Sequence, residues 1–274
     1  MHPLDTAISL DQLSKGSYRA HTSAAYANMV GPFGGVTSAL LLNAVMRHED
    51  KLGDPISLTV NFAAPVADGE ILVEAQPVRT NRSTQHWLMQ ATQNDEVVAF
   101  ATAVTAVRRE TWSAHEALPP RDAPDPLTLA RMDTTDKPVW TQCYDMRYMD
   151  GDMPAQPGGA GEPDGEEQNH SYSCLWVRDE PPRPLDFVSL SAICDSYFPR
   201  IFIRRQRRLP IGTISMTTYF HADTAMLSAQ GEQFLLATAK ALNFRNGYFD
   251  QTAEVWSADR QLLASTHQMV YFRD

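Results

Sequence analysis

The most apolar segment of the chain follows a glycine-rich stretch at residues 31–35. The run from 38 to 46 is apolar on nearly every side, which is typical of a helix surrounded by other structure. It predicts a helix from about Val36 to His48. Residues 56–64 then alternate between apolar and polar side chains, which predicts a strand with one buried face. Three more strands are predicted further along, at about 70–79, 84–93 and 97–107.

The second half of the chain repeats this order. Two predicted strands, at about 139–149 and 171–178, precede a helix at about 186–198. The apolar residues of this helix have helical spacing, and Pro199 fits just beyond its end. Four further strands are predicted at about 213–221, 233–244, 248–257 and 262–272.

The two halves are similar enough to be copies of one unit. Residues 214–222 align with residues 56–64, and five of the nine positions are identical. Residues 261–264 align with 96–99, each after a polar turn. Because both matches occur in the same order around a similar helix, we interpret the chain as a duplication. Each copy is then a long apolar helix followed by a four-stranded antiparallel meander, and a sheet curled around such a helix would bury it. The predicted fold class is α+β, a double hotdog.

Two segments interrupt this pattern. Residues 113–138 carry five prolines and few aliphatic side chains, which favours a linker over a helix or a central strand. The predicted organisation is an N-terminal hotdog at 1–112, a proline-rich linker at 113–138 and a C-terminal hotdog at 139–274. Residues 151–170 are rich in glycine and acidic side chains, and we expect a mobile surface loop there.

Composition excludes several classes of protein. The 274 residues carry a formal net charge of −10, and nucleic-acid binding needs a basic surface. The longest apolar runs are much shorter than the roughly 20 residues of a membrane span, and the N-terminus has no secretory pattern. The cysteines are odd in number and widely spaced, which favours reduced thiols and a cytoplasmic location; they are Cys143, Cys174 and Cys194.

Several catalytic motifs are missing from the sequence. It has no Gly-x-Ser-x-Gly motif of serine hydrolases, no metal-binding histidine pair, and no glycine-rich phosphate or dinucleotide loop. We therefore expect neither a metal nor a cofactor. A hotdog hydratase needs an aspartate and a histidine close in sequence, but after Asp195 the next histidine is His221.

Short motifs along the whole chain resemble those of the acyl-CoA thioesterase II, or TesB-like, family. They are Phe33-Gly34-Gly35, Asn81-Arg82-Ser83, Asp195 within 194–199, Thr213-Ile214 with Phe220-His221, and Ala264 to Gln268. The resemblance implies a double hotdog that hydrolyses acyl-CoA to a free acid and coenzyme A. It also implies that Asp195, Thr213 and Gln268 hold the attacking water.

The same three residues have alternative interpretations from the sequence alone. A buried Asp195 could orient or deprotonate a water, or it could cap a loop or pair with a downstream arginine. Gln268 interrupts a mostly apolar strand face, so its amide could hold the water or the thioester oxygen, or satisfy a backbone group. Thr213 begins a strand, where threonine is common without any catalytic role.

The duplication restricts where a site can be. It places Thr213 opposite Pro55 and Gln268 opposite Ala103, so the first half lacks two of the three groups. We therefore predict one active site per chain, built mainly from the second half. The first half could add backbone amides of Gly34 and Gly35 that stabilise an oxyanion, although these glycines could equally serve close helix packing.

A run of arginines follows the second predicted helix. Arg204 and Arg205 within it could bind the phosphates of coenzyme A, or they could belong to a solvated basic loop or a subunit salt-bridge patch. The leading interpretation is an acyl-CoA thioesterase that forms a homodimer or homotetramer. The alternatives are an acyl-CoA binding protein without activity, or a thioesterase for carrier-protein-bound acyl groups, which the acidic surface disfavours.

Overall fold

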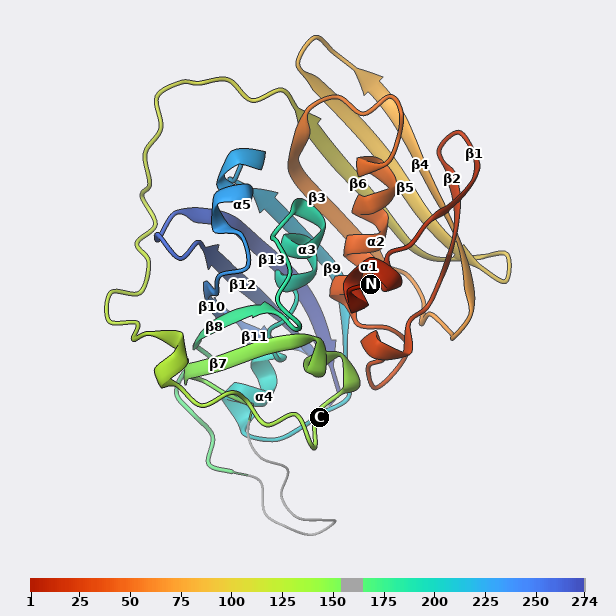
Figure 1. Ribbon diagram of the computed structural model, residues 1–274. Coiled ribbons are helices and arrows are strands. Elements are labelled where there is room, and N and C mark those ends of the chain that lie inside the picture. Colours follow the sequence, from red (N-terminus) through yellow and green to blue (C-terminus); the bar gives the residue numbers. More distant parts are fainter. Residues whose placement is uncertain (154–164, 274) are drawn as a thin grey trace.

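The computed structural model describes residues 1–153 and 165–273. Within this part of the chain, all strands join in one continuous antiparallel sheet that curls around two central helices (Figure 1). The elements of the first half are α1 (Pro3–Ala7), β1 (Asp11–Ser14), β2 (Ser17–His21), α2 (Gly34–Met46), β3 (Asp54–Phe62), β4 (Glu70–Thr80), β5 (Thr84–Gln93) and β6 (Glu96–Ala106). Those of the second half are β7 (Tyr144–Asp150), β8 (Ser173–Asp179), α3 (Phe187–Ile193), α4 (Arg200–Arg205), β9 (Ile211–Phe220), α5 (Thr224–Gln230), β10 (Leu235–Lys240), β11 (Phe244–Arg245), β12 (Tyr248–Trp256) and β13 (Leu262–Phe272).

The order of strands in the sheet reveals the duplication. From its outer edge to the centre, the first half reads β1-β2-β4-β5-β6-β3, and the second half reads β7-β8-β10-β12-β13-β9. The two halves meet where β3 pairs with β9, and Thr59 lies opposite Thr217 there. Their hydroxyl oxygens are 3.0 Å apart. Since these threonines occupy equivalent positions in the sequence repeat, a pseudo-twofold axis passes between them. The predicted double hotdog is confirmed.

Both central strands also contain the same irregularity. The pairing of β3 with β6 shifts between Pro55 and Ser57, and the pairing of β9 with β13 shifts between Thr213 and Ser215. Each shift is a bulge of one extra residue, and a bulge re-aims the side chains next to it. The repeat therefore extends to the local backbone as well as to the order of the elements.

The first central helix is surrounded by protein, as its all-round apolar sequence predicts. α2 runs from Gly34 to Met46, and most of its residues are buried. The second central helix is much shorter than predicted. α3 ends at Ile193, a second helix α4 begins at Arg200, and the predicted helix to residue 198 is wrong at its C-terminal end. A tightened turn at Asp195 and Ser196 ends α3. Pro199 prevents one continuous helix through α3 and α4, because proline lacks the N–H that such a helix needs and disfavours helical geometry at the residue before it.

Other boundaries differ from the expectations for local reasons. The predicted strand at 139–149 begins with a short 3-10 helix at Val139–Cys143, and the predicted strand at 233–244 is divided into β10 and β11. The hairpin of β1 and β2 and the helices α1 and α5 were not predicted. These elements are four to seven residues long, which is too short for a clear hydrophobic period.

The segment between the halves has little regular structure. Residues 107–125 contain neither helix nor strand, and one 3-10 turn follows at Pro126–Thr128. The expected mobile loop at 151–170 falls largely on residues 154–164, which lie outside the described residues. Within the described part of the chain, no helix is long and apolar enough to cross a membrane.

Candidate active site

The carboxylate of Asp195 lies at the junction of the two halves. The end of α3 tightens into a turn, in which the N–H groups of Asp195 and Ser196 donate to carbonyls three residues earlier. From this turn the Asp195 side chain extends toward β13. The side-chain amide of Gln268, on β13, donates a hydrogen bond to Asp195 Oδ1 over 2.7 Å. The structure therefore brings together two of the three residues that the resemblance implicates.

The first turn of α2 closes the other side of this carboxylate. A Cβ atom on Gly34 would lie 2.7 Å from Asp195 Oδ2, so any larger residue would displace the carboxylate. A Cβ atom on Gly35 would lie 2.5 Å from the carbonyl oxygen of Ala192 in α3. Both interpretations of the glycine pair thus find support: Gly34 admits a functional group to the backbone, and Gly35 permits close packing of the helices.

Asp195 has a strongly perturbed pKa. Burial raises its pKa to about 7, although hydrogen bonds from the Gln268 side chain and the Gly35 backbone act in the opposite direction. Taken over all its atoms, Asp195 is half-buried. A carboxylate with this pKa is about half ionised at neutral pH and is a much stronger base than an ordinary aspartate. Among the described residues, the hydrogen-bond partners of the Asp195 carboxylate are the Gln268 amide and the Gly35 backbone, and neither is a downstream arginine.

Gln268 is held in place by a second contact. Its amide nitrogen also lies 3.3 Å from the sulfur of Met216 on β9, and Gln268 and Met216 are direct cross-strand neighbours. The sequence analysis did not identify Met216. The signal was present in the repeat alignment, where Met216 replaces Leu58 and adds a weak acceptor to an apolar position.

The bulge in β9 places Thr213 on the face of the sheet that carries Gln268. Thr213 pairs with Val270, and cross-strand neighbours point to the same side. Val270 shares a strand face with Gln268, since the two are two residues apart. The side chain of Thr213 therefore projects to the side of the sheet that carries Gln268 and Asp195, and it is partly exposed. Thr213 forms no direct hydrogen bond with either residue.

The arginines after α3 separate into two environments. Arg204 and Arg205, in the last turn of α4, both form ion pairs with Glu167, and the Arg204 pair is 2.7 Å long. They belong to a helix, which corrects the expectation of a basic loop. Arg200 is completely buried and donates to backbone carbonyls, Ser173 and Gln251, so it links α4 to the sheet.

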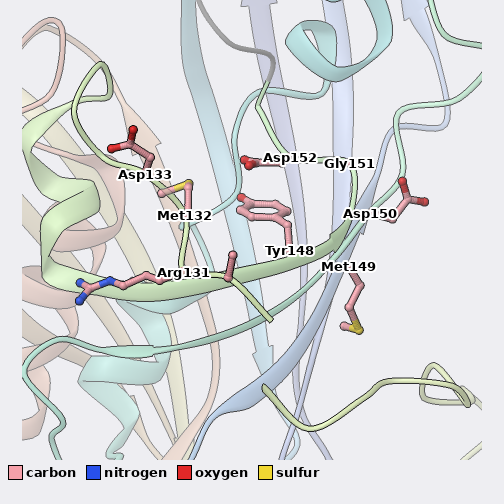
Figure 2. Close-up of a pocket in the computed structure, with 9 residues that line it drawn as sticks. Arg131, Met132, Asp133, Tyr148, Met149, Asp150, Gly151 and Asp152 are labelled. Carbon is pink, nitrogen blue, oxygen red and sulfur yellow. The ribbon is translucent and has the colours of Figure 1, made fainter. Parts of the chain in front are cut away.

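Two cavities are present near the second half, and neither is lined by Asp195, Thr213 or Gln268. The larger, of about 390 Å³, lies beside β7 and is lined by residues 130–133 and 148–152, with the Tyr148 ring next to Asp152 (Figure 2). The smaller, of about 250 Å³, lies over β10 and β12. Within the described residues, no group of three or more histidine, cysteine or acidic side chains is arranged to hold a metal ion.

The fold and the position of these side chains define a double hotdog protein with a buried carboxylate–amide pair between its halves. Comparisons with known proteins identify the family. The acyl-CoA thioesterase N-terminal domain matches residues 23–106, and the acyl-CoA thioesterase C-terminal domain matches residues 115–272. The chain therefore belongs to the acyl-CoA thioesterase family, as the sequence motifs indicated, and this membership implies hydrolase activity on a thioester.

Solved structures agree with the fold. A hot dog fold protein of unknown function from Alicyclobacillus acidocaldarius is 43% identical, with a TM-score of 0.93 and coverage of 100% of this chain and 99% of that chain. The acyl-CoA thioesterase II TesB2 of Mycobacterium marinum is 18% identical, with a TM-score of 0.76 and coverage of 98% of both chains. At 18% identity, the similarity between the two structures supports a shared fold and nothing more specific. Among curated proteins, none matches the chain.

Proposed function

We propose that this protein hydrolyses acyl-CoA to a free carboxylic acid and coenzyme A. The observation that carries the proposal is the contact of Asp195 with Gln268 at the first turn of α2. This arrangement supplies a base, a fixed amide and a helix N-terminus at one point. A binding protein without activity has no need of a carboxylate with a raised pKa next to an amide donor.

The proposed reaction is a single displacement. The Asp195 carboxylate takes a proton from a water that Thr213 and Gln268 orient, and the water oxygen bonds to the thioester carbonyl carbon. The resulting oxyanion is stabilised by backbone N–H groups in the first turn of α2, where the helix dipole also favours negative charge. The carbon–sulfur bond then breaks, and coenzyme A leaves as a thiolate that takes up a proton. Arg204 and Arg205 are proposed to bind the phosphates of coenzyme A, in exchange for their pairing with Glu167.

The test compares the wild-type protein with Asp195→Asn on a panel of acyl-CoAs, following the release of free thiol. We expect the substitution to lower kcat by about a thousandfold, because general-base catalysis contributes roughly 10² to 10⁴. Turnover by the variant at the wild-type rate would contradict the role of Asp195. Binding of acyl-CoA by the wild type without any turnover would instead support the binding-protein alternative.

Folding of the variant can be checked in the same samples. The raised pKa means that the charged carboxylate costs stability above a pH of about 7, whereas the protonated form below the ordinary aspartate pKa does not. Asparagine removes this cost. The melting temperature of Asp195→Asn should therefore exceed that of the wild type at about pH 8 and approach it at about pH 4.

A further inference from the structure

Three buried hydroxyl groups, one on α3 and two on the sheet, have no hydrogen-bond partner among the residues that the structure describes. They belong to Ser191 on α3, Thr218 on β9 and Thr266 on β13, which we call the hydroxyl cluster. Ser191 and Thr218 are 0% exposed, and Thr266 is 4% exposed. Buried polar groups in proteins are almost always paired, so these three hydroxyls require partners, either water or a group that binds there.

The two threonines are neighbours on the inner face of the sheet. Thr218 and Thr266 are direct cross-strand partners, and the next inward-facing pair along the same strands is Met216 and Gln268. On its other side, Thr218 lies opposite Leu58 of β3, which offers no hydrogen bond. The two hydroxyls are therefore one inward-facing pair away from the amide that contacts Asp195.

The position of Ser191 follows from the contacts at the two ends of α3. Residues 187, 191 and 195 are four apart, so they lie on one side of the helical turn. Phe187 packs edge-on against Phe220, with ring centroids 5.7 Å apart, and Asp195 contacts Gln268. From residue 187 to residue 195 a helix advances about 12 Å, and from residue 264 to residue 268 a strand advances about 13 Å. The two distances are nearly equal, so the middle of the helical segment is level with the middle of the strand segment. Along the helix, Ser191 is accordingly level with Thr218 and Thr266 on the strands.

The first half provides a comparison within the same chain. At the positions of Thr218 and Thr266 it has Val60 and Ala101, which are also direct cross-strand partners and fully buried. The hydroxyls of α2 are also different, because Ser38 and Thr37 donate to carbonyls of their own helix. Unpaired buried hydroxyls at this place are therefore a feature of the catalytic half and not of the fold.

We propose that the hydroxyl cluster is a subsite for the acyl group, and that it selects acyl-CoAs with a hydroxyl or keto oxygen a few carbon atoms from the thioester. This inference rests on the proposed thioesterase function. One helical turn separates Ser191 from Asp195, about 5.4 Å, which is the reach of a substituent near the reacting carbonyl. A site that bonds such an oxygen discriminates against the analogue without it, because its own polar groups are then left unpaired.

The experiment measures kcat/KM for a β-hydroxyacyl-CoA and for the unsubstituted acyl-CoA of equal chain length. The wild-type protein should prefer the hydroxylated substrate. Thr218→Val, which installs the side chain of the first half, should lower the ratio of the two values by about tenfold, the effect of one lost hydrogen bond. Thr218→Ser keeps the hydroxyl and should restore the wild-type ratio. A merely structural role of Thr218 would change both substrates alike and leave the ratio constant.

A matched control is available one residue away. Thr217 lies on the same strand but faces the outer side of the sheet toward Thr59, so Thr217→Val should leave the ratio unchanged. If the wild type hydrolyses both substrates equally, or if Thr218→Val does not change the ratio, the subsite is overturned and the hydroxyls hold only water. Absence of thiol release from either substrate would overturn the proposed function itself, which is a separate outcome.

Discussion

The two halves of this protein have nearly the same backbone and different inner surfaces. Both have the same strand order, a central helix and a bulge at the same position of the central strand. Around the second bulge the inward side chains are Thr213, Met216, Thr218, Thr266 and Gln268. Their counterparts in the first half are Pro55, Leu58, Val60, Ala101 and Ala103, all without a polar side-chain group.

This difference explains how one copy of a fold can be specialised. At these five positions the first half carries only apolar side chains, which stabilise it through burial. The second half accepts buried polar groups, which are costly unless they are bonded. The first half still contributes to the candidate site, because the backbone of Gly34 in α2 lies against Asp195 of the second half.

After the loss of the Asp195 carboxylate, the next largest effect is expected when Gln268 is replaced by its counterpart in the first half. Gln268→Ala removes the amide next to Asp195, and we expect kcat to fall by about a hundredfold, within the range for loss of one positioned donor. Steady-state thiol release measures the effect. Gln90→Ala, which removes an amide from β5 in the first half, serves as the control and should keep the wild-type kcat. Retention of kcat in Gln268→Ala would mean that the polar inner surface has no part in catalysis.

The pH dependence of the reaction should distinguish Asp195 from ordinary aspartates. Burial raises its pKa to about 7, and the base acts only when it is ionised. We therefore expect kcat/KM to fall about tenfold for each pH unit below about 7 and to be constant above it. A rate profile recorded with a substrate stable over this range is the measurement. A profile that stays flat down to about pH 5 would show that Asp195 is not the base.

Thr213 should have a smaller effect than Gln268. Thr213→Val keeps the shape of the side chain and removes the hydroxyl, and we expect kcat to fall by about tenfold through the loss of one hydrogen bond to the attacking water. The matched control is Thr252→Val, on β12 of the same half. An increase in KM with constant kcat would assign Thr213 to substrate binding and not to the water.

The smallest effect is expected for the arginines of α4. Arg204→Ala combined with Arg205→Ala should raise KM for acyl-CoA by a few fold and leave kcat almost constant, because exposed ion pairs contribute about 1 kcal/mol or less. The same variant should show no increase in KM for a short thioester that lacks the nucleotide. Constant KM for both substrates would restrict these residues to their pairing with Glu167.

The sequence by itself determined the duplication, the fold class and two members of the candidate site. Repeated segments and an all-round apolar helix are patterns of the chain, and burial physics gives them few solutions. Gln268 stood out because it interrupts an apolar strand face, and Asp195 because a carboxylate is rare at the end of a buried helix. The family motifs added Thr213 to this set.

Only the tertiary structure decided how these groups meet. The contact of Asp195 with Gln268 joins residues 73 positions apart, and the approach of Gly34 to Asp195 joins the two halves. The turn that ends α3 places Asp195 opposite Gln268. The bulge after Thr213 turns that side chain to the inner face of the sheet. Ser191 is level with the two threonines because α3 and the strands advance by nearly equal distances. These relations depend on packing between distant elements, and no local pattern in the sequence encodes such packing.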